Sequence, residues 1–184
     1  DLHSFPTRRS SDLMLKLVLP DITHKDKVIS YKEEFRKNCE SMDGTAGLES
    51  TESYEQWMKH IKENSNKETV KEGFVPATTF LAIRQEDNEL VGMIDIRHEL
   101  NEFLFDFGGN IGYSIRKGER RKGYATEMLK LALEECKKIG LDKILLTCSK
   151  TNLGSAKTMV NNGAVLEREV KKWQDIIQRY WIVL

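Results

Sequence analysis

The segment from residue 111 to residue 126 has the composition of an anion-binding turn. An apolar run, Ile111–Ile115, leads into a basic turn that contains Gly123, and a helical pattern begins immediately afterwards. The first N–H groups of a helix lack partners within the helix and lie at the positive end of its dipole, which suits a phosphate or pyrophosphate. The cations of the turn are Arg120, Arg121 and Lys122. The pattern therefore indicates either a phosphate-binding strand–turn–helix unit or a solvated basic turn ahead of a surface helix.

The other residues that could do chemistry form no recognisable motif. The patterns GxxxxGK[ST] and GxGxxG, which bind phosphates in nucleotide-binding proteins, are both absent from the sequence. Cys39, Cys136 and Cys148 are widely spaced, and the four histidines are scattered singly. This spacing provides neither a metal cluster nor a disulfide framework, so we expect no metal cofactor and a reducing, cytoplasmic location.

The remaining sequence predicts the elements that hold the turn in place. Strand patterns cover residues 14–19, 78–84, 90–97, 111–115, 143–148, 165–170 and 176–183, and helical patterns follow Asp21 and cover residues 53–64, 125–139 and 155–162. The order β-α-α-β-β-β-α-β-α-β-β predicts a mixed α/β fold with a largely antiparallel sheet flanked by helices.

Three local patterns predict how these elements pack. The buried stripe of the helix at 125–139 is expected to consist of Tyr124, Met128, Leu131, Ala132 and Ile139. Residues 143–148 are apolar without polar alternation, which predicts a central strand buried on both faces. Gly92 lies inside a strand pattern, which predicts a bulge or a close backbone approach.

The composition limits the fold and its partners. A chain of 184 residues with 39% hydrophobic and 32% charged residues fits one globular domain. Lys+Arg and Asp+Glu both number 29, so the formal net charge is zero, which argues against a nucleic-acid partner. No run approaches the roughly 18–20 apolar residues of a membrane span, so we expect no membrane partner.

The residues before Met14 differ from the rest of the chain. They are polar and include the run Arg-Arg-Ser-Ser at positions 8–11, without the apolar stretch of a secretory signal. Residues 8–13 also correspond to the translation of a common sequencing adapter. We interpret residues 1–13 as a non-native or disordered extension, the alternative being a basic targeting arm, and residues 14–184 as a single domain.

The basic turn also carries a family signature. Its residues Arg120-x-x-Gly123-x-Ala125 match the motif Q/R-x-x-G-x-G/A, and the strand residue Ile115 stands five positions before Arg120. This motif is the signature of the GCN5-related N-acetyltransferases (GNAT), and the chain resembles that family here.

The resemblance extends over most of the chain. Asn152, Ser155 and Gly163 resemble the family element N-x-x-[AS] followed by glycine, and the order of elements from Met14 onward matches the family architecture. The chain is most similar to uncharacterised bacterial members that carry the segment Arg-His-x-Leu-Asn, here residues 97–101. The resemblance therefore implies the acyl-CoA N-acyltransferase fold and a single N-acetyltransferase domain.

The resemblance implies acetyl-CoA as the acetyl donor. Its pyrophosphate would lie on the turn, which consists of Arg120, Arg121, Lys122, Gly123, Tyr124, Ala125 and Thr126. Its pantetheine arm would pair with the backbone near Ile115, in a gap between the strands at 111–115 and 143–148. Asn152 and Ser155 would contact the cofactor beyond that gap, although a helix-capping role for Asn152 is equally open.

The resemblance also implies direct transfer of the acetyl group to a primary amine. Many family members place a tyrosine, which acts as an acid, seven residues after the asparagine, but this chain has Met159 there. The acid is therefore open, and the alternative function is a catalytically weak acyl-CoA-binding or sensing domain. The acceptor is expected to be a small-molecule or peptide amine, and the final hairpin leaves a homodimer open.

The base that deprotonates the amine is sought between the central hairpin and the turn. The candidates in this stretch are Asp95, His98, Glu99, Glu102 and Asp106. Glu102 is preferred because burial against Phe103 and Phe105 would raise its pKa into a useful range. His98 is the second choice because an imidazole titrates near neutral pH. The alternative for each is a solvated loop charge.

Overall fold

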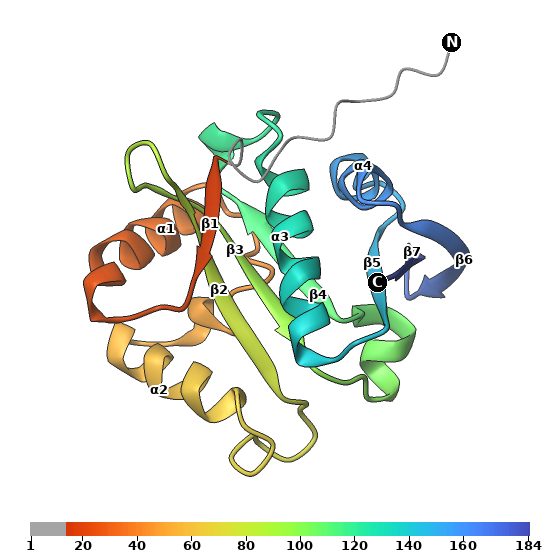
Figure 1. The fold of residues 1–184 in the computed structure, drawn as a ribbon, viewed down its shortest axis with the longest axis horizontal. Helices are drawn as coiled ribbons and strands as arrows, with labels where there is room; N and C mark the ends of the chain where they lie inside the picture. The colour runs from red at the N-terminus through yellow and green to blue at the C-terminus, as the bar shows by residue number, and fades with distance from the viewer. Residues whose placement is uncertain (1–13) are drawn as a thin grey trace.

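The computed structural model describes residues 14–184, and the extension at residues 1–13 lies outside this range. The fold is mixed α/β, as the sequence predicts (Figure 1). Its elements are β1 (Leu15–Val18), α1 (Lys25–Lys37), α2 (Tyr54–Asn64), β2 (Ala77–Arg84), β3 (Leu90–Arg97), β4 (Ile111–Ile115), α3 (Tyr124–Ile139), β5 (Lys143–Ser149), α4 (Leu153–Asn161), β6 (Val165–Lys172) and β7 (Asp175–Val183). A π-helical segment, η4 (Leu104–Gly108), lies between β3 and β4. The order of helices and strands is the predicted one.

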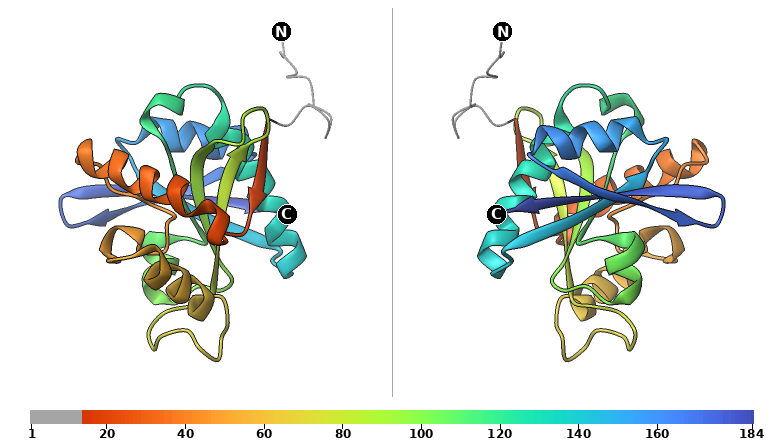
Figure 2. Two further views of the ribbon diagram at one scale, coloured as in Figure 1. Left: turned by 90° about the vertical axis from the view of Figure 1, so that its left-hand side faces the viewer. Right: turned by 90° about the vertical axis from the view of Figure 1, so that its right-hand side faces the viewer.

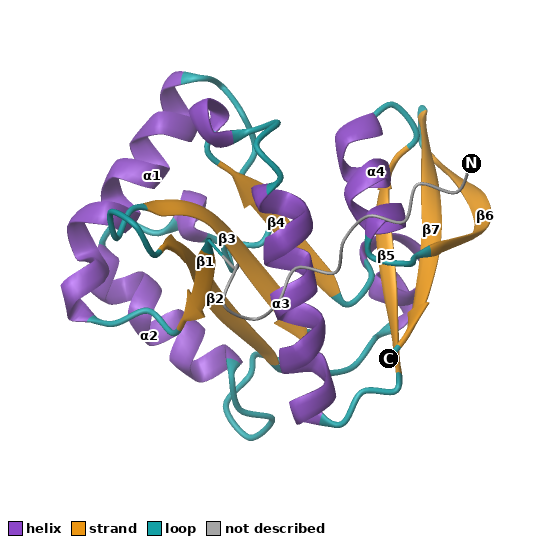
Figure 3. Cartoon of the chain, turned by 45° about the horizontal axis from the view of Figure 1, so that its top comes forward, coloured by secondary structure: helices purple, strands orange, loops and turns teal. Residues whose placement is uncertain are grey.

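The strands form two antiparallel sheets that meet at β4 and β5. The four-stranded sheet has the order β1-β2-β3-β4, and the three-stranded sheet has the order β5-β7-β6. The sheets are joined where the backbone N–H of Asn110 donates to the carbonyl of Leu145 (2.7 Å) and the Asn110 side chain accepts from the Leu145 N–H (2.8 Å). From this joint the two strands diverge (Figure 3). We call the stretch without backbone pairing between β4 and β5 the strand gap.

Helices cover both faces of the first sheet. Helices α1 and α2 pack on one face and α3 on the other, as Figure 1 shows. Each face has its own hydrophobic core, in which Trp57 of α2 and Met128 of α3 are fully buried. We call these the α1/α2 face and the α3/α4 face. No helix among residues 14–184 is long and apolar enough to cross a membrane.

Helix α3 buries a wider surface than the predicted stripe. Glu127, Leu129, Leu133 and Cys136 are also buried, and the Glu127 carboxylate accepts a hydrogen bond from the N–H of Leu15 in the edge strand β1 (2.6 Å). The wide surface follows from the position of α3, which contacts β1, β3, β4 and α4. Ile139 was predicted to be buried and is instead exposed, because it is the last residue before Gly140 ends the helix.

The prediction of a buried central strand at 143–148 is confirmed for its burial and corrected for its position in the sheet. Its residues Ile144, Leu145 and Leu146 are fully buried, as the apolar run predicts. However, β5 is an edge strand of its own sheet, because beyond the joint it pairs with β7 alone among the described strands.

Two other local predictions concern helix α4 and Gly92. Helix α4 begins at Leu153 rather than Ser155, because the Asn152 side chain accepts from the Ser155 N–H (3.1 Å) and caps the first turn. The prediction for Gly92 is confirmed. The β2–β3 register shifts beside it, and a Cβ atom at this position would lie 2.8 Å from the Ser114 carbonyl oxygen.

Asn110 is expected to control the stability of the joint. Asn110→Ala would leave the buried N–H of Leu145 without its acceptor, which costs about 1–3 kcal/mol of unfolding free energy. Urea denaturation followed by circular dichroism measures this loss. The control is Asn161→Ala, which removes an exposed asparagine on α4. Equal, small effects of the two substitutions would mean that the joint does not depend on this side chain.

Candidate active site

The basic turn before α3 presents unpaired backbone N–H groups. Arg121 and Gly123 both have left-handed backbone conformations, with φ values of 65° and 87°. The first bond of the helical ladder runs from the Glu127 N–H to the Gly123 carbonyl (3.1 Å). The N–H groups of residues 123–126 therefore have no acceptor within the described chain. A left-handed residue other than glycine costs about 1–2 kcal/mol, so Arg121 holds backbone strain directly beside these unpaired N–H groups.

The three cations of the turn have different environments. The Arg120 Nε donates to the Ile115 carbonyl (2.9 Å), and its guanidinium pairs with Glu40, whose pKa this hydrogen bond lowers. Lys122 pairs with Glu119 (3.0 Å). Arg121 is exposed and has no acidic partner among the described residues. Arg120 thus fastens the turn to the end of β4, while Arg121 remains available to an anion.

The backbone of β4 turns alternate residues toward the strand gap. The Asn110 carbonyl accepts from the Arg97 N–H (2.7 Å), and the Arg116 N–H donates to Val91 (2.9 Å). Even-numbered residues of β4 therefore bond to β3. Because successive residues of a strand present their backbone groups to opposite edges, the groups of Tyr113 and Ile115 are directed to the gap.

Strand β5, on the opposite side of the gap, also directs the backbone groups of alternate residues to the gap. Leu145 directs both its N–H and its carbonyl to Asn110, so it is the even-numbered residues of β5 that bond to β7. The backbone groups of Thr147 and Ser149 consequently face the gap. An extended ligand can therefore pair with either strand edge as an added strand would.

Hydroxyl groups line the gap on the α3/α4 face. The Tyr113 hydroxyl lies 2.7 Å from the Ser155 Oγ, so it reaches from β4 to the first turn of α4. Burial raises the pKa of Tyr113 to about 12 and also raises the pKa of the Cys148 thiol. Met159 is buried and carries no hydroxyl. Tyr113 and Ser155 are thus hydroxyl proton donors here, together with Thr158, whose side chain also bonds to Tyr113.

The α1/α2 face of the gap carries carboxylates and an arginine. Asp95 is buried and accepts a hydrogen bond from the Thr79 hydroxyl (2.8 Å), and its Oδ2 lies 4.0 Å from the Arg97 Nε. Burial raises the pKa of Asp95, against the opposing effects of Arg97 and Thr79. In the β3–β4 register Asp95 lies opposite Gly112 of β4, the strand that borders the gap.

Asp43 is a candidate that the sequence analysis did not identify. Its carbonyl accepts from the Ser114 hydroxyl (2.6 Å), which places it against β4. Its carboxylate stays accessible to solvent, although partial burial raises the pKa of Asp43 against the effect of Arg97. The sequence signal was the loop Asp-Gly-Thr-Ala-Gly at 43–47, which predicts a turn but not its contact with a strand seventy residues away.

The two predicted bases lie past the closed end of the gap. His98 follows Arg97, which pairs with Asn110 at the joint, and its Nε2 lies 2.8 Å from the Thr78 hydroxyl. Burial lowers the pKa of His98. Glu102 is exposed, and the rings of Phe103 and Phe105 are 55% and 44% exposed. The burial expected for Glu102 is therefore wrong, although the catalytic roles of Glu102 and His98 stay predictions.

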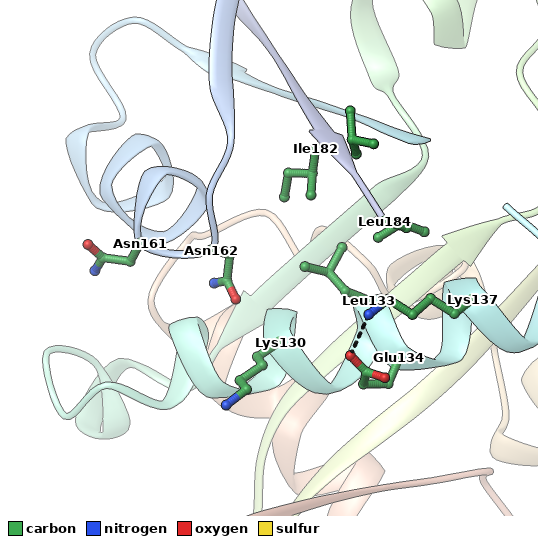
Figure 4. Close-up of a pocket in the computed structure, with 9 residues that line it drawn as sticks. Lys130, Leu133, Glu134, Lys137, Asn161, Asn162, Ile182 and Leu184 are labelled. Carbon is green, nitrogen blue, oxygen red and sulfur yellow. Dashed lines mark hydrogen bonds and ion pairs between the residues drawn. The ribbon is translucent and has the colours of Figure 1, made fainter. Parts of the chain in front are cut away.

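A surface hollow lies away from the strand gap. It is lined by residues of α3, the end of α4 and the end of β7, including Lys130, Asn162 and Leu184 (Figure 4). None of the predicted site residues lines it. The Asn162 side chain links it to the turn by donating to the Thr126 carbonyl (3.1 Å).

Comparison with protein families decides the assignment. Residues 16–165 match the model of the acetyltransferase (GNAT) domain. The chain belongs to the GNAT family of acetyltransferases. The resemblance inferred from the turn motif and the order of elements is confirmed, and the enzyme class is N-acetyltransferase. No functionally curated protein matches the sequence.

Solved GNAT structures share the fold at low sequence identity. An acetyltransferase of the GNAT family from Bacillus anthracis is 20% identical, with a TM-score of 0.61 over 92% of this chain and 95% of that one. The ribosomal L7/L12 α-N-protein acetyltransferase RimL, in complex with coenzyme A, is 19% identical, with a TM-score of 0.64 over 93% and 94%. A spermidine N-acetyltransferase chimera from Vibrio cholerae and hSSAT is 15% identical, with a TM-score of 0.63 over 92% and 96%.

The buried Asp95 gives this GNAT domain a pH-dependent stability. A carboxyl whose pKa is raised by folding destabilises the folded state once it ionises, so stability falls as pH rises through the folded pKa. Asp95→Asn should therefore gain unfolding free energy relative to the native chain between about pH 4 and about pH 7.

Urea denaturation at the two pH values measures this difference. Asp142→Asn, at an exposed position, is the control for removing a carboxylate in general. A variant that loses more stability near pH 7 than near pH 4 would show that Arg97 and Thr79 favour the ionised form of Asp95.

Proposed function

We propose that this chain is an acetyl-CoA-dependent N-acetyltransferase that transfers an acetyl group directly to a primary amine. The observation that carries the proposal is the combination of two unpaired backbone surfaces at one end of β4. One is the set of free N–H groups at residues 123–126, and the other is the pair of open strand edges along the gap. The first suits a pyrophosphate and the second suits an extended amide-containing arm.

The turn and the gap fit successive parts of coenzyme A, the turn its pyrophosphate and the gap its pantetheine arm. Arg121, Lys122, Gly123, Tyr124, Ala125 and Thr126 would bind the pyrophosphate, chiefly through backbone N–H groups. Arg120 would act as a positioning residue, because its guanidinium bonds to the Ile115 carbonyl and pairs with Glu40. The N–H of Ile115 would pair with the pantetheine arm. Asn152 and Ser155, at the N-terminus of α4, would contact the arm from the other side of the gap. The bound thioester would supply the activated acetyl group.

Two groups of the gap suit the transfer itself. The N–H of Tyr113 is directed to the gap and would stabilise negative charge that develops on a carbonyl oxygen there. The Tyr113 hydroxyl has a pKa of about 12 and therefore keeps its proton at neutral pH. With Ser155 it would donate a hydrogen bond to the leaving thiolate, in place of the hydroxyl that Met159 lacks.

The acceptor would approach from the α1/α2 face, because α3 and α4 cover the other side. The carboxylates nearest to β4 on that face are Asp43, whose backbone carbonyl bonds to Ser114, and the buried Asp95 opposite Gly112. RimL is named for a ribosomal protein acceptor and the Vibrio chimera for spermidine, so small amines and peptide amines both belong to the proposed class. We also propose a cytoplasmic enzyme, and a homodimer through the exposed outer edge of β6, which projects with β7 from the body of the molecule (Figure 2).

The second candidate function is a catalytically weak acyl-CoA-binding or sensing domain. It is favoured by the absence of a hydroxyl at Met159 and by the exposure of Glu102. Release of free thiol from acetyl-CoA in the presence of a broad amine panel distinguishes the two. Binding of acetyl-CoA without release of thiol would support the sensing domain.

Acetyl-CoA binding is expected to depend on Gly123. Gly123→Glu places a negative charge and a strained left-handed residue where the pyrophosphate would lie. Calorimetry on the folded variant should show acetyl-CoA affinity reduced at least about tenfold, or about 1.4 kcal/mol. The matched control is Gly118→Glu, which adds the same side chain to open space five residues earlier, without a left-handed backbone. Equal affinities of the two variants would move the cofactor away from the turn.

Deprotonation of the amine is expected to depend on a carboxylate of the α1/α2 face. Asp43→Asn should lower kcat/KM by roughly 10²–10⁴, with acetyl-CoA affinity nearly unchanged, because a general base acts on the acceptor and not on the donor. Glu102→Gln and His98→Ala test the two bases that the sequence favours. Profiles of kcat/KM against pH for the three variants identify which one loses the acidic limb. Native rates in all three would assign the proton transfer to water.

A further inference from the structure

The guanidinium of Arg120 joins the basic turn to a loop eighty residues away in the sequence. Its Nη1 donates to the Glu40 Oε1 (3.1 Å), its Nη2 donates to the Glu40 Oε2, and its Nε donates to the Ile115 carbonyl (2.9 Å). A forked arginine–carboxylate pair fixes the relative orientation of its partners as well as their distance. Because every nitrogen of this guanidinium has an acceptor, it holds Glu40 and the end of β4 in one arrangement.

Glu40 belongs to the 38–47 loop, which follows α1 and also carries Asp43. The Asp43 carbonyl accepts from the Ser114 hydroxyl of β4 (2.6 Å), and the Thr45 carbonyl accepts from the indole N–H of Trp57 in α2 (2.8 Å). The loop is therefore bonded to β4 and to α2 as well as to the basic turn. Among these three contacts, the one through Glu40 connects the loop to the proposed cofactor site.

The first half of the 38–47 loop depends on this contact more than on burial. Cys39 and Ala46 have φ values of 53° and 49°, and Gly44 between them is also left-handed (73°). A left-handed residue other than glycine is strained and persists only where surrounding contacts hold it. None of residues 38–41 is buried. The polar contact of Glu40 is thus the restraint available to the segment that leads from α1 to Asp43.

We infer that Glu40 is a positioning residue that couples the basic turn to the acceptor side, so that acetyl-CoA bound at the turn orders the loop that carries Asp43. This inference rests on the proposed function. A pyrophosphate on the N–H groups of residues 123–126 would fix the turn, and Arg120, at the start of the turn, would fix Glu40 with it. The acceptor would then bind more tightly to the acetyl-CoA complex than to the free chain, because the first ligand has already removed conformational freedom from the loop.

Amide hydrogen exchange of the native chain, free and saturated with coenzyme A, tests the coupling. Coenzyme A should slow exchange in the turn at residues 121–127, and it should slow exchange in the 38–47 loop about fivefold, the lower end of the usual coupling between sites. In Glu40→Gln the turn should still respond, but the loop should slow less than about twofold because the forked charged pair is lost. The matched control is Glu33→Gln, which removes a carboxylate whose arginine partner, Arg36, lies on α1 itself (2.8 Å).

A second substitution tests the same contact from the turn. Arg120→Gln keeps a residue that the family motif allows but removes the fork that grips Glu40. Its effect on the loop should equal that of Glu40→Gln, and the double variant should add nothing, as expected for two residues that act through one contact. Melting temperature and calorimetric affinity for coenzyme A, measured for each variant, identify changes that come from misfolding or incomplete saturation. If Glu40→Gln melts early, Arg120→Gln and the response of the native loop still decide the question.

The outcomes separate this inference from the proposed function. Slower exchange of both segments in the native chain, without thiol release from acetyl-CoA in the amine panel, supports the coupling and contradicts the transferase. Slower exchange of the turn alone, or equal slowing of the loop in the native chain and in Glu40→Gln, overturns the coupling and leaves the transferase intact. Unchanged exchange in the turn contradicts the cofactor site and the coupling together.

Discussion

The architecture depends on a single joint between two sheets. Asn110 contributes its N–H to the Leu145 carbonyl, its side-chain oxygen to the Leu145 N–H and its carbonyl to the Arg97 N–H. One residue therefore closes one end of the strand gap and aligns β3, β4 and β5. β4 and β5 share no other backbone pairing among the described residues, so the N–H groups of Tyr113 and Ile115 remain available to a ligand, while Arg120 occupies the Ile115 carbonyl and Asn152 the Ser149 carbonyl. The open strand edges that the proposed cofactor requires thus exist because backbone pairing between β4 and β5 ends at Asn110 and Leu145.

Arg97 connects this joint to both faces of the molecule. Its backbone pairs with Asn110, and its side chain bonds to the carbonyls of η4 while it faces Asp95. The closed end of the gap is consequently rigid. The open end is held differently, because the Arg120 Nε bonds to the Ile115 carbonyl and its guanidinium pairs with Glu40. The cofactor turn and the acceptor side are therefore positioned from opposite ends of the same five-residue strand.

The sequence predicts the local elements better than it predicts their contacts. The order of strands and helices, the capping role of Asn152 and the glycine turn all follow from short patterns, because they depend on backbone conformation within a few residues. Asp43 was missed because its position depends on packing of Gly44 against Gly112, a contact between distant segments. Glu102 was expected to be buried by its phenylalanine neighbours, but neighbours along a chain need not share a face. Long-range contacts of this kind leave no local signature.

The features that destabilise the folded chain lie outside the two hydrophobic cores. Arg121 holds a left-handed conformation, Asp95 is a buried carboxylate with a raised pKa, and the fully buried Arg179 leaves its Nη2 without a partner beneath η4. Each of these features destabilises the folded chain. The residues that offset them, such as Trp57 and Met128, lie in the separate clusters under α2 and α3. Because stability and the site are supplied by different parts of the fold, the N–H groups of residues 123–126 can remain without acceptors among the described residues, and their open hydrogen-bonding capacity is what a ligand would use.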